Sequence, residues 1–450
     1  MSLAGPGLDA KGDMPLGPFG ARVVWCGAVK RLLLVCYYFP PAAGGGIARP
    51  LSFARYLPAL GWQVTVLCAD HGSAPLADTS RPLGLPQGVE VIRVPMPEGA
   101  AKSRRAVIGG KQGRPSGLYR TARGVASWIW VPDSFAPWAP IATMYAKERL
   151  ERGGVRAILT TSPPDTVHLV GLGLTTRLPW IVDFRDPWIG LTYKRPPTPL
   201  HAWRQRKLRD QVLQRADLLL ATTKASAAQL SKLAPAGKRI RVLPNGWDPD
   251  FTAIAALARG EGPGRRLRVV YTGTLWDVPA ARMFFAALAH VLTTNADKRA
   301  IEVDIVGPYE SEEKNLVHKL GLGEVVRFVG QVGYEESRKR QSEADVLLVL
   351  QVHGPGFELA IPGKLYEYLA TTRPILALLP PGEGADLVTR AGGWVVAPDD
   401  ARGAEAVLQR LLAGERPAGE SSARQMIAYE HRRDRIAERL AHLLDEVTSR

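Results

Sequence analysis

The chain has 450 residues, of which 46% are hydrophobic and 22% are charged, and its formal net charge is +15. This length suits two or three ordinary domains, and the composition is that of a globular protein rather than a disordered one. No run of about 18 apolar residues is present, so the sequence predicts no membrane-spanning helix.

The first thirty residues are rich in glycine and proline and lack a continuous apolar core followed by a small-residue cleavage site. We therefore expect residues 1–30 to form a flexible tail rather than a secretory signal. The cysteines Cys26, Cys36 and Cys68 lack metal-ligand spacing. They are typical of buried thiols in a reducing compartment, so we expect a cytoplasmic protein.

Alternating strand-like and helix-like segments predict an α/β architecture with parallel sheets. Most strand candidates are near-continuous apolar runs, as expected of strands that are covered on both faces. In the first half we predict strands at residues 31–38, 63–69, 89–94, 156–162, 179–184, 217–223 and 239–244. After a turn-rich linker the pattern restarts, with strands at 266–273, 302–307, 325–330, 345–352, 374–380 and 393–398.

Two complete series of this kind predict two doubly wound, Rossmann-like domains, at residues 31–246 and 247–425, that face one another across a cleft. Such sheets bind ligands beyond the carboxyl ends of their strands, so the cleft is the expected binding site. Residues 426–450, the last part of the chain, have apolar residues at helical spacing with charged residues between them. They predict one long amphipathic terminal helix that packs back toward the first domain.

The positive charge is concentrated in two segments. Residues 101–124 carry seven Lys or Arg and no acid, and residues 194–215 carry seven bases against Asp210 alone. No nucleic-acid-binding motif accompanies them, so we predict no nucleic-acid partner. An anionic membrane surface and a phosphorylated substrate both fit such a surface, and so does a solvated basic face without any partner.

A glycine-rich loop, YYFPPAAGGGIARP at residues 37–50, joins the first strand to a helix. A dinucleotide fingerprint would need a glycine at Arg49, and the loop is longer than the tight turn of that motif. A wide surface loop without a ligand is the structural alternative. The position at the carboxyl end of the first strand instead favours a place at the mouth of the cleft.

The second half contains HGPGFELAIPGKLYEYLATTRPILALLPPGE at residues 353–383. A loop rich in Gly and Pro opens there into a helix that starts at Pro362, Gly363 and Lys364, where free N–H groups and the helix dipole suit a phosphate. Glu367, one turn further on, is suited to accept hydrogen bonds from ribose hydroxyls. Phosphate and ribose together indicate a nucleotide.

From residue 31 to the end, the chain resembles a family 4 glycosyltransferase of the GT-B fold. The motifs that carry the resemblance are YYFPPAAGGGIARP, TSPPDTVHLVGLGL, DFRDPW, LPNGWDPDF, YTGTL, RFVGQVGYEE and IPGKLYEYLATTRPILAL. The resemblance implies a nucleotide-sugar donor in the second domain and an acceptor in the first. It also implies a retaining reaction that uses no cofactor and no metal.

Site residues follow from the same resemblance. It assigns Glu367 to the ribose and the helix start to the donor phosphates or sugar. At the helix start these residues are Gly363 and Lys364. Donor contacts are also expected from Gly44, Gly45 and Gly46 in the glycine loop, from Gly273 and Thr274 beneath the diphosphate, and from Gly330 and Val332 at the edge of the base.

The chain departs from the family pattern at two positions. The glutamate expected eight positions before Glu367 is replaced by Leu359, and Glu358 lies one residue away as a candidate for contacting the donor sugar. Arg282 is the one nearby base after YTGTL that could neutralise the diphosphate, and a solvated helix arginine is the alternative reading.

Charged residues in the first domain suggest an acceptor side. Asp183, Arg185 and Asp186 end a strand in DFRDPW, where they could hold the acceptor or shape the reaction centre, or form an internal pair that fixes the loop. Asp186 is the catalytic candidate among them. His168 is a catalytic candidate through its motif, although its apolar neighbours are typical of a core histidine. Asp248 and Asp250 suit a turn and a helix cap, so we predict no metal site there.

The expected function is therefore transfer of a sugar from a nucleotide-sugar to a glycan, a lipid-linked molecule or a small molecule, with peripheral contact to an anionic membrane left open. An epimerase or phosphorylase of the same fold, and a donor-binding protein without catalysis, are the competing interpretations.

Overall fold

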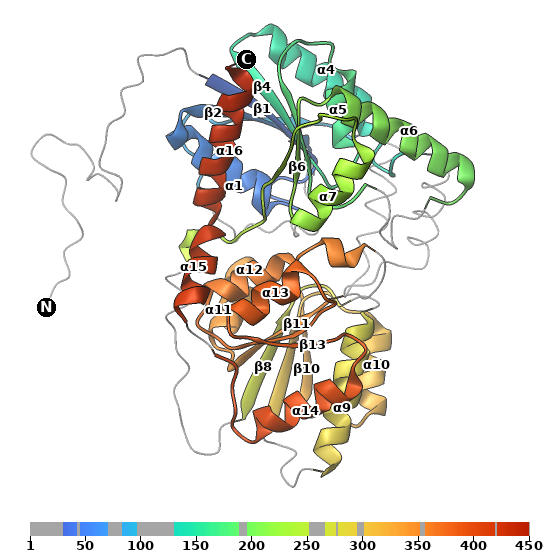
Figure 1. Cartoon of the computed structure of the whole chain (residues 1–450), viewed down its shortest axis with the longest axis vertical. Coiled ribbons are helices and arrows are strands. Elements are labelled where there is room, and N and C mark those ends of the chain that lie inside the picture. Colours follow the sequence, from blue (N-terminus) through green and yellow to red (C-terminus); the bar gives the residue numbers. More distant parts are fainter. Residues whose placement is uncertain are drawn as a thin grey trace, which may run out of the picture.

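A computed structural model describes residues 30–42, 46–70, 83–96, 130–188, 196–251, 266–275, 278–294, 301–351, 356–418 and 421–449. Gly44 and Gly45 of the glycine loop, and the basic segment at 101–124, lie outside the described residues. Figure 1 shows two domains stacked along the long axis of the molecule.

The first domain is built on a seven-stranded parallel sheet of order β3-β2-β1-β4-β5-β6-β7. Its strands are β1 (Lys30–Cys36), β2 (Trp62–Ala69), β3 (Glu90–Val94), β4 (Val155–Thr161), β5 (Trp180–Phe184), β6 (Leu218–Ala221) and β7 (Ile240–Val242). The helices that cover it are α1 (Ala48–Tyr56), α4 (Trp138–Glu151), α5 (Val167–Gly173), α6 (Pro199–Arg215) and α7 (Lys224–Leu233). Short 3-10 helices lie in the same half of the chain: η1 (Leu57–Leu60) comes directly after α1, and η3 (Pro249–Phe251) comes after β7.

The second domain has a six-stranded parallel sheet of order β10-β9-β8-β11-β12-β13. Its strands are β8 (Leu267–Thr272), β9 (Ile301–Val306), β10 (Val326–Gly330), β11 (Val346–Leu350), β12 (Ile375–Leu378) and β13 (Trp394–Val396). The helical elements are α9 (Pro279–Thr294), α10 (Ser311–Lys319), α11 (Tyr334–Ser342), η4 (Phe357–Leu359), α12 (Gly363–Ala370), α13 (Glu383–Arg390) and α14 (Ala401–Leu412).

Both sheets confirm the predicted α/β class, and every predicted strand is present within two residues of its expected ends. The apolar runs in the sequence predict the strands correctly because both faces of each sheet are buried. Helices α9, α10 and α14 cover one face of the second sheet, and α12 and α13 cover the other. In each sheet the order of the strands changes direction next to the strand that comes first in the chain, β1 or β8. Doubly wound folds bind their ligands at this point.

The terminal segment is two helices, α15 (Ser422–Glu430) and α16 (Arg433–Thr448), so the prediction of one long helix is wrong. The helix stops because the backbone at the break pairs with the interdomain linker: the Trp247 amide donates to the His431 carbonyl, and the Arg433 amide donates to the Trp247 carbonyl. Side chains of α15 enter the core of the second domain, and those of α16 enter the core of the first. Figure 1 shows α16 running along the upper domain beside α1.

Candidate functional site

Three glycines form a flat floor at the carboxyl edge of the second sheet. Gly273, Gly307 and Gly330 follow or end β8, β9 and β10, with positive φ angles of 122°, 135° and 82° that favour glycine. The Gly273 amide donates to the Val306 carbonyl at 2.8 Å, and the Gly307 amide donates to the Gly330 carbonyl at 2.8 Å. A Cβ on Gly307 would overlap the carbonyl oxygen of Gly273, so this position requires glycine.

Helix α12 begins beside this floor. Pro362 occupies its N-cap position and has no polar side chain that could accept from the first N–H groups. Gly363 is exposed, and a Cβ built there would meet nothing within 4 Å. The helix start is therefore open and presents the positive end of its dipole, an arrangement that favours an anion.

Lys364 connects the helix start with the floor. Its Nζ lies 3.6 Å from the centroid of the Tyr271 ring, and a Cβ built on Gly273 would lie 3.0 Å from the same nitrogen. Burial lowers the pKa of Lys364 to about 7, although the Glu367 carboxylate acts in the opposite direction. The amine therefore changes between its charged and neutral forms near pH 7.

Glu367 lies one turn further along α12 and is partly exposed. Its Oε2 accepts a hydrogen bond from Gln341 Nε2 at 3.2 Å, which orients the carboxylate from the buried side. The structure therefore brings together five of the predicted donor residues: Gly273, Gly330, Gly363, Lys364 and Glu367.

Three further donor candidates have other contacts. Arg282 on α9 is half exposed, and its Nε donates to the fully buried Glu313 carboxylate at 3.3 Å. The carbonyl oxygen of Thr274 accepts a hydrogen bond from the Tyr271 hydroxyl at 2.8 Å. Val332, which follows β10, packs against the core beneath α12.

Glu358 lies in the exposed turn η4, before α12. Gln351 Nε2 donates to the carbonyl oxygens of Phe357 and Ala360 at 2.7 and 3.1 Å, and so holds the turn from its own domain. The Glu358 side chain is exposed, and no contact within the described part of the chain assigns it to a donor sugar.

Asp183 does not face the cleft, although the sequence placed it on the acceptor side. It is 0% exposed and accepts two hydrogen bonds from Arg49, both at 2.8 Å, and one from Thr161 Oγ1 at 2.7 Å. The alternative was an internal pair within DFRDPW, whereas in the structure Asp183 pairs with Arg49 of α1. The role of Arg49 could not be predicted from the sequence, because its partner Asp183 lies 134 positions away in the chain.

Arg185 supports the glycine loop. Its guanidinium donates to the carbonyl oxygen of Gly46 at 2.9 Å. Burial lowers the pKa of Arg185, and the neighbouring Asp186 opposes that shift. Arg185 therefore fixes the end of the loop whose preceding glycines were predicted to approach the donor.

His168 is completely buried on α5. Its Nδ1 is 2.8 Å from Thr160 Oγ1, and its ring stacks at 5.9 Å between centroids on Trp188 and tilts against Phe184 at 4.9 Å. In this arrangement it packs as a core histidine, away from the accessible surface.

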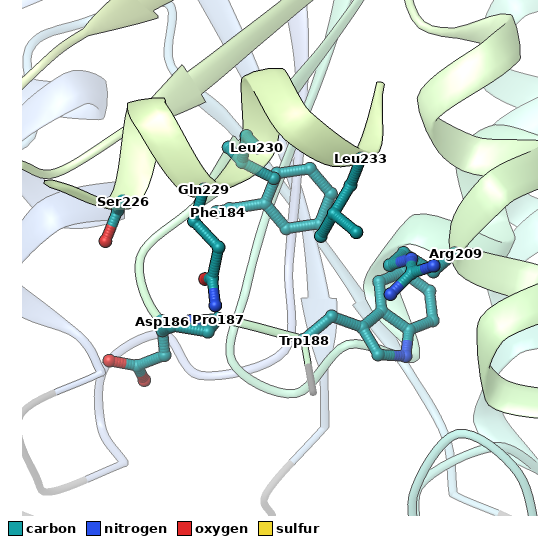
Figure 2. Close-up of a pocket in the computed structure, with 9 residues that line it drawn as sticks. All are labelled: Phe184, Asp186, Pro187, Trp188, Arg209, Ser226, Gln229, Leu230 and Leu233. Carbon is teal, nitrogen blue, oxygen red and sulfur yellow. The ribbon is translucent and has the colours of Figure 1, made fainter. Parts of the chain in front are cut away.

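Asp186 lies at the rim of a small pocket in the first domain. Figure 2 shows Phe184, Trp188, Leu230 and Leu233 gathered around it, with the Asp186 carboxylate directed away from these apolar side chains. The pocket lies at the carboxyl end of β5, between α6 and α7.

Within the described ranges, no group of three or more His, Cys, Asp or Glu side chains is placed to hold a metal ion. No helix of the described part is long and apolar enough to cross a membrane.

Comparison with known proteins identifies both halves of the chain. Residues 44–246 match the model of the glycosyl transferase 4-like domain, and residues 266–414 match that of glycosyl transferases group 1. A putative colanic acid biosynthesis glycosyltransferase, WcaL of Escherichia coli, is 25% identical over 204 residues, which are 45% of this chain and 48% of WcaL. The WcaL of Salmonella typhimurium is 24% identical over 53% of this chain and 58% of its own. The chain thus spans about half the length of these relatives.

Solved structures share the fold at low identity. Sucrose-phosphate synthase of Thermosynechococcus elongatus is 18% identical with a TM-score of 0.63, and the match covers 93% of this chain and 99% of that one. HepE of Anabaena, solved in complex with UDP and glucose, is 14% identical with a TM-score of 0.61 over 92% and 99%. With the two domain models in this order on two facing parallel sheets, the chain belongs to the family 4 glycosyltransferases of the GT-B fold.

Proposed function

We propose that the protein is a retaining glycosyltransferase that moves a sugar from a nucleotide-sugar donor to a glycan, lipid-linked or small-molecule acceptor without a metal or cofactor. The proposal rests on one observation: the open first turn of α12 carries Lys364, whose amine lies against the glycine floor, and Glu367 follows one turn later. This set supplies one place for a diphosphate and an adjacent carboxylate for a ribose.

In the reaction, the bond between the anomeric carbon and the diphosphate oxygen breaks, and its electron pair remains on the diphosphate. The N–H groups of α12 and the Lys364 ammonium stabilise this developing charge. The acceptor hydroxyl attacks from the same face, and its proton passes to the departing phosphate oxygen. The configuration at the sugar carbon is therefore retained, and the protein needs no nucleophile of its own.

The first domain supplies the acceptor side in this proposal. Asp186 is the accessible carboxylate at the pocket rim and is suited to orient an acceptor hydroxyl. Asp183 and His168, both buried, support the loops around it. The similarity to the WcaL proteins favours a growing polysaccharide as the acceptor, and the UDP bound to HepE makes a uridine nucleotide the first donor to try.

Helix α6 offers a surface for an anionic membrane. It carries five Lys or Arg and one acid, Asp210, and it exposes Leu200 by 56% and Trp203 by 52%. Gln205 Nε2 donates to the Pro132 carbonyl at 3.1 Å, which places the segment with the exposed Trp130 beside the helix. Basic residues attract anionic headgroups, and tryptophan and leucine insert at the interface. This combination supports peripheral contact at the acceptor side.

Vesicle sedimentation tests the membrane contact. Binding to phosphatidylglycerol vesicles should exceed binding to phosphatidylcholine vesicles and should weaken with salt, because exposed charges are screened. The double change Leu200→Ser and Trp203→Ser should reduce it, whereas Met426→Ser, at a residue 64% exposed on α15, should not. No binding at low salt contradicts the contact.

Calorimetric titration with nucleoside diphosphates and their sugars tests the proposed function itself. One nucleotide should bind, and Glu367→Ala should weaken it by about tenfold, the effect of losing one charged hydrogen bond. Glu324→Ala, at an exposed carboxylate elsewhere in the same domain, is the matched control. If no nucleotide binds, or if Glu367→Ala leaves affinity unchanged, the site is wrong.

Product analysis separates the alternatives. A transferase forms a new glycosidic bond with the anomeric configuration of the donor, whereas an epimerase returns an altered nucleotide-sugar. A donor-binding protein would bind the nucleotide without turnover, and the shifted Glu358 is the feature that favours that reading.

A further inference from the structure

The start of α7 contacts the second domain at three hydrogen bonds. Thr223 Oγ1 and Ser226 Oγ both donate to the carbonyl oxygen of Leu359, at 2.6 and 2.9 Å. The Ala225 amide donates to Glu383 Oε1 at 2.8 Å. Figure 1 shows α7 at the lower edge of the first domain, facing α12 and α13 across the division between the domains.

The acceptor of two of these bonds belongs to the turn that carries Glu358. Leu359 is the last residue of η4, and α12 starts four residues later at Gly363. Gln351 holds the same turn from within the second domain, through Phe357 and Ala360. The turn before the donor helix is therefore fixed from both domains at once.

The third bond adds an electrostatic attraction. Glu383 is the first residue of α13, and its carboxylate lies at the start of α7, where the helix dipole is positive. Thr223 caps the same helix end, because its Oγ1 accepts the Ser226 amide at 3.0 Å. The bonds to Leu359 and Glu383 form only when the two domains are together, whereas the cap lies within the first domain.

We propose that Thr223, Ser226 and Glu383 form an interdomain latch that holds the Glu358 turn in place only in the closed molecule. They are positioning residues that act through the turn, and the Ser226 side chain also lines the Asp186 pocket. This inference rests on the proposed function for its consequence: the donor-sugar side of the site is completed by the acceptor domain. Nucleotide binding by α12 is then independent of the latch, and sugar transfer depends on it.

Two substitutions weaken the latch without disturbing the fold. Ser226→Ala removes one hydroxyl donor and keeps the backbone N–H that Thr223 caps. Glu383→Gln keeps the shape of the side chain and removes its charge. Ser231→Ala, at an exposed serine of the same helix, is the matched control, and Ser226→Thr keeps the hydroxyl as a conservative rescue.

A distance measurement between the domains decides the proposal without any substrate. Spin labels at Met144→Cys on α4 and Lys314→Cys on α10, both exposed sites, report the separation in a Cys26→Ser background, since Cys36 and Cys68 are buried. Combining Ser226→Ala with Glu383→Gln should broaden the distribution and shift it, while Ser231→Ala and Ser226→Thr should not. An unchanged distribution in the combined variant overturns the latch.

Kinetics then separates the latch from the proposed function. The combined variant should keep the nucleotide dissociation constant within about twofold and lose about tenfold or more in kcat, as expected for the loss of one hydrogen bond and of the charge on a second. A shifted distance in a protein that shows no transfer leaves the latch standing and overturns the proposed function. Transfer at the wild-type rate by the combined variant overturns the latch alone.

Discussion

Arg49 and Asp183 form a buried bidentate ion pair that ties three parts of the first domain together. Both Arg49–Asp183 hydrogen bonds are 2.8 Å, and the side chains are 4% and 0% exposed. The same guanidinium donates to the carbonyl oxygens of Leu243 and Pro244, at 3.0 and 2.7 Å. The pair therefore connects α1, β5 and the start of the linker to the second domain.

Removing either partner should destabilise the first domain strongly. Arg49→Met leaves the Asp183 carboxylate buried without its counter-ion, which costs about 3–5 kcal/mol, whereas joining it to Asp183→Leu should cost less than either change alone. Chemical denaturation followed by circular dichroism measures the shift of the first-domain transition. If Asp183→Asn left stability unchanged and impaired only acceptor use, the carboxylate would belong to the acceptor site after all.

The glycine floor gives a second prediction. Gly307→Ala should displace the Gly273 carbonyl and weaken nucleotide binding, because its Cβ would overlap that oxygen. Gly321→Ala is the control, since Gly321 also has a positive φ, 71°, but no atom within 4 Å of a Cβ. Both changes carry the backbone strain of about 1–2 kcal/mol. Calorimetry with the nucleotide should show a loss of affinity for Gly307→Ala alone, and equal affinities would remove the floor from the site.

Local patterns explain why so much of the fold was predictable. The strands are apolar runs between turn residues, and the three floor glycines end the runs YTG, IVG and FVG, although only Gly273 and Gly330 were assigned a role. The helix start at Gly363 and Lys364 could be identified because its Gly and Pro content and following carboxylate lie within one short stretch.

Features set by distant partners were not predictable. Asp183 looked accessible because its partner Arg49 is on another element, 134 positions away. The break between α15 and α16 depends on pairing with Trp247 in the linker. Ser226 carries no local signal for contact with Leu359, which lies 133 positions further along the chain. In each case the sequence presents a polar group or a helical pattern, and the fold decides what it meets.

The terminal helix α16 should behave as part of the first domain. Leu440 is fully buried in the core that contains α1, so Leu440→Ala should cost about 2–5 kcal/mol. Leu443→Ala, at a partly buried neighbour, should cost less. Hydrogen exchange locates the effect: α1 and β2 should exchange faster, while β8 and β9 should keep their protection. Faster exchange in β8 and β9 alone would place the helix with the second domain.

Lys364 should make nucleotide affinity depend on pH. Its pKa in the free protein is lowered to about 7, so the ammonium is the main form below that pH and is lost above it. A bound diphosphate favours the charged form and raises the pKa, so binding takes up a proton at higher pH. Affinity should then fall by up to about tenfold per pH unit above about pH 7, until the pKa of the complex is reached.

Lys364→Arg is the matched variant for this dependence. Arginine stays charged throughout this range, so its nucleotide affinity should be nearly flat across it, whereas Lys364→Met should bind weakly at every pH. Calorimetry in buffers of different ionisation enthalpy measures the proton uptake directly. A wild-type affinity that does not change with pH, with no proton taken up, would mean that the Lys364 amine is not the group that meets the diphosphate.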